Sequence, residues 1–465
     1  MIFNILASNK NWHKYSLEEI CLKVTSGGTP SRKNPKLYEN GNINWVKTKE
    51  LNNGYIWESE EKITEEAVRK SSAKLLPVNT ILLAMYGATV GELGVLGKEM
   101  ACNQACCALI IDPKKADYRF IFYLLRLYKK EIQSLATGAA QQNLSAKTIK
   151  EFCFYIPSLE KQTEIADILS ELDKKIQLNT QINQTLEQIA QALFKSWFVD
   201  FDPVRAKVQA LSDGLSLEQA ELAVMQTISG KTPEELTALS QTQPERYAEL
   251  AETAKAFPCE MVEVDGGEVP KGWELKALSD IGQIICGKTP SKSNKEFYGN
   301  DVPFIKIPDM HNQVFITQTT DNLSVAGANS QSKKYIPPKS ICVSCIATVG
   351  LVSMTSKPSH TNQQINSIIP NDEQTSEFLY LSLKQPSMTK YLKDLASGGS
   401  ATLNLNTSTF SKIEIMTPSK EIIDIFHNKV VYAFEKVLSN SIENKRLAEI
   451  RDLLLPNLLN GESDE

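Results

Sequence analysis

Ala88-Thr89-Val90-Gly91 occurs a second time in this chain, as Ala347-Thr348-Val349-Gly350. Matching pairs lie on both sides of it: Thr29-Pro30-Ser31 with Thr289-Pro290-Ser291, Asn103-Gln104 with Asn362-Gln363, Asn143-Leu144 with Asn404-Leu405, and Pro157-Ser158 with Pro418-Ser419. The offset between the copies stays between 259 and 261 residues, so single-residue gaps align them. A period this long indicates two copies of a whole domain, because solenoid units repeat every ~20–50 residues.

Composition places the chain among globular proteins of two or more domains. It has 465 residues, of which 42% are hydrophobic and 23% charged, as is ordinary for a soluble protein. We find no apolar run of the ~18 residues that a membrane helix needs, and the first residues lack a signal-peptide layout. Nine cysteines, an odd number, favour reduced thiols in a cytoplasm. Cys342 and Cys345 have no second pair to complete a metal site, so buried strand cysteines are the better interpretation.

The charge is unevenly distributed along the chain. Residues 12–158 carry 20 Lys and Arg against 15 Asp and Glu, and residues 273–418 carry 13 against 11. Residues 159–272 carry 10 against 20. The repeats are therefore mildly basic and the segment between them is acidic, so a polyanion would prefer the repeats.

Each repeat reads as a mixed α/β domain. Strand-like runs at 43–46 and 80–85 are broken by Gly and Asn turns, and a helical stretch follows at 119–135. The second copy has the same order, with a strand at 341–346 and a helix at 377–395. We therefore expect α/β (α+β) globular domains, duplicated along the chain.

A long helix is predicted after each Pro-Ser pair. In the first, Ile165, Leu172, Leu186 and Leu193 are spaced by seven or fourteen residues, and the missing heptad position is Asn179; at an offset of 261 it is Asn440. A polar residue on a buried stripe costs stability and fixes helix register. We therefore expect the two helices to pair as an antiparallel coiled coil with a pseudo-two-fold axis; packing of each helix on its own domain is the alternative.

These observations divide the chain into five parts. The expected parts are a first domain at 12–158, a long helix at 159–200, an acidic helical connector at 201–272, a second domain at 273–418 and a second long helix at 419–460. Within the connector, helices are expected at 216–228 and 232–256. A helix of about 33 residues spans ~50 Å, while one turn of duplex DNA is ~34–36 Å. Paired helices could therefore hold two DNA-reading domains one turn apart.

Several strings resemble one known family, the specificity subunits of type I restriction–modification systems. They are Gly28-Thr29-Pro30-Ser31, Trp45-Val46-Lys47-Thr48, the run from Ala84 to Gly91, the run from Leu193 to Arg205 (LFKSWFVDFDPVR) and Arg451-Asp452-Leu453-Leu454-Leu455-Pro456. The resemblance covers nearly the whole chain, except 206–265, which is longer than the family's connector.

The resemblance implies that each repeat is a target recognition domain for one half of a split DNA site. It also implies that the helices set the spacing and dock two methyltransferase (modification) subunits, which motor/nuclease (restriction) subunits join. No cofactor is then expected on this chain, whereas S-adenosylmethionine, ATP and magnesium are expected on those partner subunits.

Two catalytic motifs were sought in the sequence, and neither supports an enzyme. Gly282 to Thr289 formally matches the phosphate-binding loop G-x-x-x-x-G-K-[ST], but its middle is strand-like and Pro290 follows, so we reject a nucleotide site. The Asn/Asp-Pro-Pro-Tyr/Phe tetrapeptide of amino-methyltransferases is missing from the sequence, whose sole Pro-Pro is Pro337-Pro338. We therefore predict a non-catalytic recognition subunit; a protein-binding scaffold, or a fragment of a fused restriction enzyme or methyltransferase, is the alternative.

Candidate DNA-binding residues are polar loop residues at corresponding positions: Thr29, Ser31, Arg32, Lys33, Lys47, Gln141, Gln142 and Asn143 in the first copy, and Thr289, Ser291, Lys292, Lys306, Ser400, Thr402 and Asn404 in the second. Such side chains bind phosphates or base edges. The alternative for residues shared by both copies is that they hold loops through side-chain to backbone bonds. Sequence reading is then expected where the copies differ.

Four aromatic residues gather at the end of the first long helix, namely Phe194, Trp197, Phe198 and Phe201. Aromatic side chains are enriched at subunit interfaces, so we favour a docking patch for a partner subunit. Simple capping of a core is the alternative.

Overall fold

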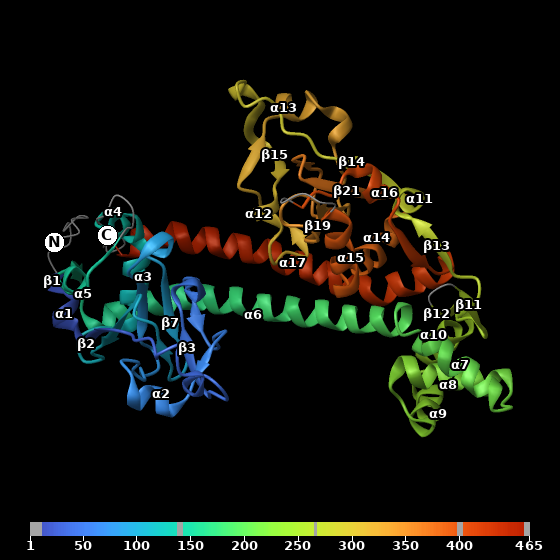
Figure 1. The fold of residues 1–465 in the computed structure, drawn as a ribbon, viewed down its shortest axis with the longest axis horizontal. Helices are drawn as coiled ribbons and strands as arrows, with labels where there is room; N and C mark the ends of the chain where they lie inside the picture. Colours follow the sequence, from blue (N-terminus) through green and yellow to red (C-terminus); the bar gives the residue numbers. More distant parts are fainter. Residues whose placement is uncertain (1–11, 137–142, 265–266, 398–402, 460–465) are drawn as a thin grey trace. The chain divides into compact units, whose positions relative to one another are not determined.

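The computed structural model describes residues 12–136, 143–264, 267–397 and 403–459 (Figure 1). The chain divides into two compact units, the first made of residues 1–176 and 446–465, the second of residues 177–445. Each unit contains one repeat, and each is described by itself.

Two sheets and a strand pair build the repeat of the first unit. The five-stranded sheet has the order β2-β9-β6-β7-β4, the three-stranded sheet has the order β5-β3-β8, and β1 pairs with β10. The strands are β1 His13–Ser16, β2 Cys21–Ser26, β3 Ile43–Val46, β4 Tyr55–Ile56, β5 Lys62–Ile63, β6 Ile81–Ala84, β7 Leu93–Leu96, β8 Ala101–Cys102, β9 Cys106–Ile111 and β10 Cys153–Ile156. The central strand β6 is buried along its whole length, since Ile81 and Leu83 pack in one core cluster and Leu82 and Ala84 in another.

The repeat of the second unit has the same topology. Its sheets have the orders β14-β21-β18-β19-β16 and β17-β15-β20, and β13 pairs with β22. The strands are β13 Glu274–Ala277, β14 Gly282–Cys286, β15 Tyr298–Ile305, β16 Phe315–Ile316, β17 Asp321–Leu323, β18 Ile341–Ser344, β19 Val352–Thr355, β20 His360–Thr361, β21 Ile365–Pro370 and β22 Glu414–Thr417. The predicted α/β duplication is therefore confirmed strand by strand.

Helices cover these sheets, and in each repeat one helix that is expected to be continuous is broken in two. The helices of the first repeat are α1 Leu17–Ile20, α2 Glu65–Lys70, α3 Tyr118–Leu127, α4 Lys129–Ser134 and α5 Ala146–Lys150; those of the second are α11 Leu278–Ile281, α12 Ile307–Met310, α13 Val325–Asn329, α14 Ser376–Lys384, α15 Pro386–Ala396 and α16 Thr407–Ser411. The helix expected over 119–135 breaks at Tyr128, and the one over 377–395 breaks before Pro386. The second break is explained by its proline, which lacks the amide that continues a helix and pushes the preceding residue out of helical geometry.

Between the repeats, the acidic segment forms a helical module in the second unit. It contains α7 Asp202–Ser212, α8 Leu217–Ser229, α9 Pro233–Thr242, α10 Pro244–Ala256 and the hairpin strands β11 Met261–Val264 and β12 Gly267–Pro270. The helix expected over 232–256 breaks before Pro244, as proline again explains. Lys207 is 3% exposed, and its Nζ donates to the carbonyls of Ala254, Lys255 and Phe257 at 3.1, 3.2 and 2.9 Å. These bonds cap the end of α10 and fix it to α7.

The two long helices are α6, Leu159–Phe198, and α17, Lys420–Leu459. In the first unit, Arg451 Nη1 of α17 lies 2.5 Å from Asp173 Oδ1 of α6, and Leu455 and Leu459 share a core with Ile165. Because late residues of α17 meet early residues of α6, the helices run antiparallel there.

Buried asparagines join the same helices in the second unit. Asn179 is 1% and Asn440 0% exposed. Asn179 Nδ2 donates to Asn444 Oδ1 at 3.0 Å, and Asn440 Nδ2 donates to Asn183 Oδ1 at 2.9 Å. At the offset of 261 residues, Asn183 corresponds to Asn444 and Asn179 corresponds to Asn440. Each of the two contacts is therefore the copy of the other. Mutual pairing of the helices in antiparallel direction is therefore confirmed.

The aromatic residues at the end of α6 belong to the interior of the second unit. Phe194, Trp197 and Phe198 are 3%, 2% and 5% exposed, and they pack against aromatic rings of α14, α17 and the segment after α10, among them Phe378, Phe426 and Phe257. Phe201 packs edge-on against Trp273 at 5.5 Å. The expectation of a docking patch is wrong for this cluster, because the connector and second repeat cover it; the alternative of core capping holds.

All nine cysteines are free thiols, and Cys342 and Cys345 are buried on and beside β18. Burial raises the pKa of the Cys342 thiol to about 12, so it is an inert apolar group at neutral pH. None of the helices in the described ranges is both long and apolar enough to cross a membrane.

Candidate nucleic-acid interface

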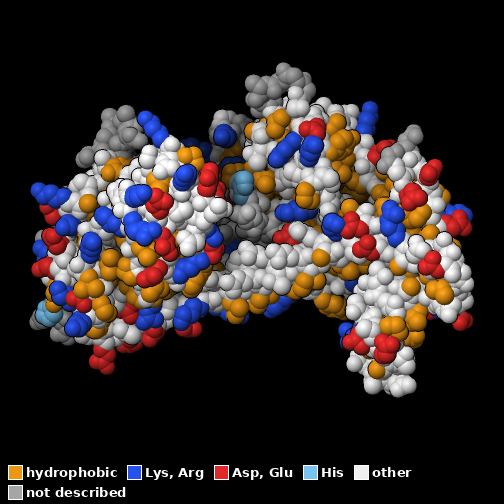
Figure 2. All heavy atoms as spheres, turned by 60° about the horizontal axis from the view of Figure 1, so that its bottom comes forward, with side chains coloured by type: hydrophobic (Ala, Val, Ile, Leu, Met, Phe, Trp, Pro, Cys, Tyr) orange, Lys and Arg blue, Asp and Glu red, His pale blue; other side chains and the backbone are white. Residues whose placement is uncertain are grey.

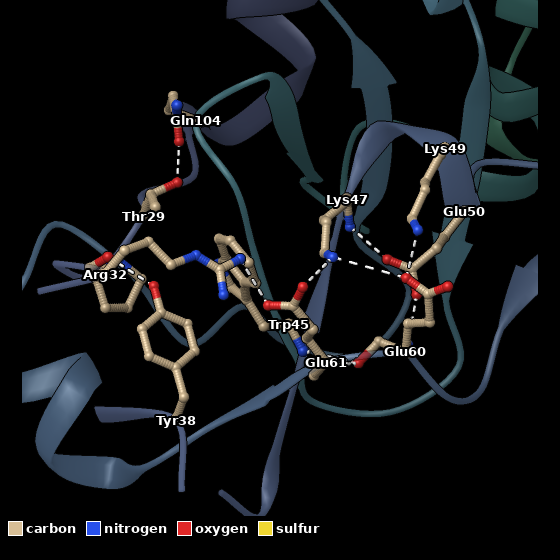
Figure 3. Close-up of polar contacts among 12 residues, drawn as sticks. Thr29, Arg32, Tyr38, Trp45, Lys47, Lys49, Glu50, Glu60, Glu61 and Gln104 are labelled. Atoms are coloured by element: carbon tan, nitrogen blue, oxygen red, sulfur yellow. Dashed lines mark hydrogen bonds and ion pairs between the residues drawn. The ribbon is translucent and has the colours of Figure 1, made fainter. Parts of the chain in front are cut away.

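The loop that follows the first strand of each five-stranded sheet is held by the residues that both copies share. Thr29 Oγ1 donates to Gln104 Oε1, and Tyr38 Oη donates to the carbonyl of Pro30 at 2.6 Å (Figure 3). In the second copy Thr289 Oγ1 donates to Gln363 Oε1 at 2.5 Å, and Tyr298 Oη donates to the Pro290 carbonyl at 2.9 Å. The shared threonines and tyrosines therefore form a loop framework, as the structural alternative for identical residues predicts.

The candidate lysines Lys47 and Lys306 are also part of this framework. Lys47 Nζ pairs with Glu61, and Lys306 Nζ pairs with Asp321. Their backbone amides donate to Glu50 Oε2 at 2.7 Å and to Asp309 Oδ2 at 2.9 Å. The side chain of Lys47 is only 19% exposed, so much of its charge is already compensated inside the domain.

Arg32 lies at the exposed side of this framework. Its Cζ is 4.5 Å from the ring centroid of Tyr38 and 5.3 Å from that of Trp45, within cation–π range. Its Nη2 is 2.6 Å from Glu61 Oε2, and the side chain remains 56% exposed. Hydrogen bonding from Lys47, followed by that from Arg32, lowers the pKa of Glu61, which keeps this carboxylate ionised at neutral pH.

The second copy repeats the framework without the arginine. Lys292 occupies the position of Arg32 at an offset of 260, and Phe304 occupies that of Trp45 at an offset of 259. Lys306 Nζ lies 5.7 Å from the Phe304 ring, as Lys47 Nζ lies 5.9 Å from the Trp45 ring. The two copies thus share a scaffold and present different exposed groups on it.

The remaining candidates fall into two groups. Ser31, Lys33, Ser291 and Lys292 are exposed on the same loops. Asn143 and Asn404 form isolated antiparallel bridges with Tyr86 and Ile346, so the structure brings them beside the loops that hold the two Ala-Thr-Val-Gly strings. Gln141, Gln142, Ser400 and Thr402 lie outside the described residues.

One signal in the Ala-Thr-Val-Gly loops was not visible in the sequence. Ala347 has a φ of +61°, a left-handed conformation that costs a residue with a Cβ roughly 1–2 kcal/mol. Its amide donates to the Leu403 carbonyl at 3.0 Å. Strained backbone of this kind gathers at ligand-binding sites, which adds the loop to the candidate surface.

The rejected phosphate loop is a strand in the structure. Gly282–Cys286 is β14 and pairs with β21 from Gly282 to Cys286. The amides of a strand alternate between opposite sides and are used in the sheet, so they do not converge on a phosphate.

The described part of the chain thus consists of two α/β domains of one topology, each with exposed polar loops, and two long helices that pair in antiparallel direction. Residues 9–188 and 270–452 match the type I restriction modification DNA specificity domain. The chain therefore belongs to the family of type I restriction–modification specificity subunits, which recognise a DNA target and work in a complex with other restriction–modification subunits. A specificity subunit is a recognition protein and not an enzyme.

Individual relatives agree with this assignment. Over 353 residues, 74% of this chain and 77% of the relative, the chain is 79% identical to the type I restriction enzyme HindI specificity subunit of Haemophilus influenzae. It is 26% identical to the MjaIX specificity subunit of Methanocaldococcus jannaschii over 97% of this chain and 94% of that one. The fold is similar to the crystal structure of a type I restriction–modification S subunit from M. genitalium, with a TM-score of 0.53, 17% identity and 98% of both chains covered.

Proposed function

We propose that each repeat reads one half of a bipartite DNA target, and that the helix pair sets the distance between the halves. The observation that carries this proposal is the shared framework with different exposed residues, Arg32 in one copy and Lys292 in the other. Two domains of one topology bind one kind of ligand, the duplex, while their differing side chains select different bases.

The helix pair has the properties of a fixed spacer. Helix α6 has 40 residues, which at 1.5 Å per residue gives roughly 60 Å, longer than the ~34–36 Å of one duplex turn. Asn179, Asn183, Asn440 and Asn444 bond across the pair inside the second unit. Such buried polar contacts select one helix register over others, which supports a constant spacing.

Methyltransferase docking is proposed for the outer face of α6 rather than for its aromatic end. Between Lys175 and Lys195 the sequence has one charged residue, Glu187, and Figure 2 shows a stretch of white and orange atoms there. Leu178 and Ile189 are 51% and 59% exposed. An uncharged face with exposed apolar side chains fits a partner helix, because a solvated helix normally carries charges on its outer face.

On this proposal the chain works in the cytoplasm, where its DNA substrate and its partners are found. S-adenosylmethionine serves the methyltransferase subunits, and ATP and magnesium serve the restriction subunits. This chain contributes the choice of DNA sequence.

The proposal is tested by methylation mapping. DNA from cells that express this chain with its methyltransferase partner is sequenced with detection of modified bases, and DNA from cells that express the partner alone is the control. We expect a split motif, two specified halves around unspecified bases, only when this chain is present. Methylation without a split motif would refute the proposal.

A further inference from the structure

The loop clusters of the two repeats share three contacts and differ at the position of Arg32. Both clusters have the threonine–glutamine bond, the tyrosine bond to a proline carbonyl and the lysine–carboxylate pair. The first cluster adds Arg32, whose guanidinium lies on aromatic faces and beside a carboxylate. The counterpart of this arginine in the second copy is Lys292, a cation without the planar fork.

The guanidinium of Arg32 is held by two aromatic rings and one carboxylate. Tyr38 is anchored through its bond to the Pro30 carbonyl, and Trp45 is 2% exposed with its Nε1 donating to the Gly28 carbonyl at 3.0 Å. The two rings, whose planes meet at 75°, therefore contact the guanidinium from two directions, and Glu61 pairs with it through Nη2. An arginine has five N–H donors, so the rest of the fork remains available on a side chain that is 56% exposed (Figure 3).

The charges of the ion-pair cluster that contains Arg32 cancel. The cluster drawn in Figure 3 contains three cations, Arg32, Lys47 and Lys49, and three carboxylates, Glu50, Glu60 and Glu61, joined by ion pairs and hydrogen bonds. A hydrogen bond from Lys49 lowers the pKa of Glu60, and one from Lys47 lowers that of Glu61. A cluster of zero net charge is a poor anchor for phosphates, whose binding depends on excess positive charge.

We propose that Arg32 reads a guanine in the half-site of the first repeat, with Glu61 as its positioning residue; the inference rests on the proposed function. The planar fork of an arginine matches the O6 and N7 acceptors of guanine in the major groove. A guanidinium that is already oriented loses less conformational entropy on binding than a free one. Neutral surroundings suit a base edge, which has no net charge, and leave phosphate contacts to exposed residues such as Lys33.

The test is methylation mapping of Arg32 variants in complex with the methyltransferase partner. Arg32→Lys keeps the charge and removes the planar fork, whereas Arg32→Gln removes both. We expect both variants to relax one guanine position in the half-site that changes when residues 12–158 are exchanged, and to leave the other half-site intact. Arg69→Gln, an exposed arginine on α2, is the matched control and should keep the wild-type motif.

Binding by the purified complex gives the magnitude. With guanine replaced by adenine at the relaxed position, and its partner base changed to match, wild type should lose roughly 5- to 150-fold in affinity, and the Arg32 variants should discriminate far less. A 7-deazaguanine, which lacks the N7 acceptor, should weaken binding by wild type and not by Arg32→Gln. Glu61→Gln should lower the guanine-to-adenine ratio while retaining overall affinity.

Two results would overturn the inference. The first is that Arg32→Lys keeps the wild-type motif while Arg32→Gln weakens binding to every sequence equally and reduces the salt dependence, as for a phosphate contact. The second is a first half-site without guanine on either strand. Either result leaves the proposed function intact, because the wild-type complex still produces a split motif; failure of the proposed function would appear as no split motif in wild type.

Discussion

Replacement of Asn440 by leucine should stabilise the second unit, whereas the same replacement of Asn179 should not. Asn440 Nδ2 donates one hydrogen bond, to Asn183 Oδ1, and its own Oδ1 has no partner among the described residues. Loss of that bond costs about 1 kcal/mol, and removal of a buried unpaired oxygen regains about 1–3 kcal/mol. Burial of a leucine adds about 1.5–3 kcal/mol, less about 1–3 kcal/mol for imperfect fit. Taken at their midpoints, these terms give a net stabilisation of about 1 kcal/mol.

Asn179 has a different set of contacts. Its Nδ2 donates to Glu443 Oε2 at 2.8 Å and to Asn444 Oδ1 at 3.0 Å. Loss of a bond to a carboxylate costs about 1.5–3 kcal/mol and loss of the neutral one about 1 kcal/mol, which offsets the burial of leucine. We therefore expect Asn440→Leu to exceed Asn179→Leu in the free energy of unfolding.

Urea unfolding and differential scanning calorimetry of the purified full chain measure this difference. Asn440→Leu should raise the midpoint of the second unit's transition above that of wild type, and Asn179→Leu should leave it equal or lower. The reverse order of the two variants would refute the reasoning about the unpaired oxygen. The double variant should also populate other helix registers or oligomers, visible by analytical ultracentrifugation, because both register contacts are lost.

The remaining predictions concern the spacer, the domains and a buried histidine. Insertion of four residues after Thr180 and four after Ser441 keeps both asparagine contacts possible and lengthens the helix pair by about 6 Å. The insertion should widen the gap between the half-sites by one or two base pairs, at ~3.4 Å each. An active variant that keeps the original spacing in methylation mapping would contradict this prediction. Exchange of residues 273–418 for those of a relative should change one half of the mapped motif, and a change in both halves of a folded variant would disprove modular reading. His360 is 0% exposed, and burial lowers its pKa from 6.5 to about 4. The unfolded chain therefore takes up this proton first, and stability is lost as pH falls from about 6.5 to about 4, by at most about 3 kcal/mol. Urea unfolding at pH 7 and 5 should show a smaller loss for His360→Gln than for wild type, while the exposed control His311→Gln should behave as wild type.

Local sequence patterns predicted the elements well and their ends less well. The heptad stripes placed both long helices, which begin at Leu159 and Lys420 and end at Phe198 and Leu459. At Pro386, Pro244 and Tyr128 the sequence predicts one continuous helix, whereas the structure has two helices that are separated at that residue. Periodicity continues through a break when the buried face is kept, so it does not show where hydrogen bonding along the backbone stops.

The sequence by itself determined the duplication, the α/β class and the pairing of Asn179 and Asn440 with the opposite helix, because these follow from offsets and spacing along one chain. The sequence could not determine which polar and aromatic residues are exposed and which are covered or paired with an opposite charge. The aromatic end of α6 reads as a docking patch until Phe378, Phe426 and Phe257, distant in sequence, are seen to cover it. The sequence does not show that Lys47 pairs with Glu61, or that Arg32 lies against Tyr38, Trp45 and Glu61. Burial and charge compensation depend on neighbours in space, and those neighbours are decided by the tertiary structure alone.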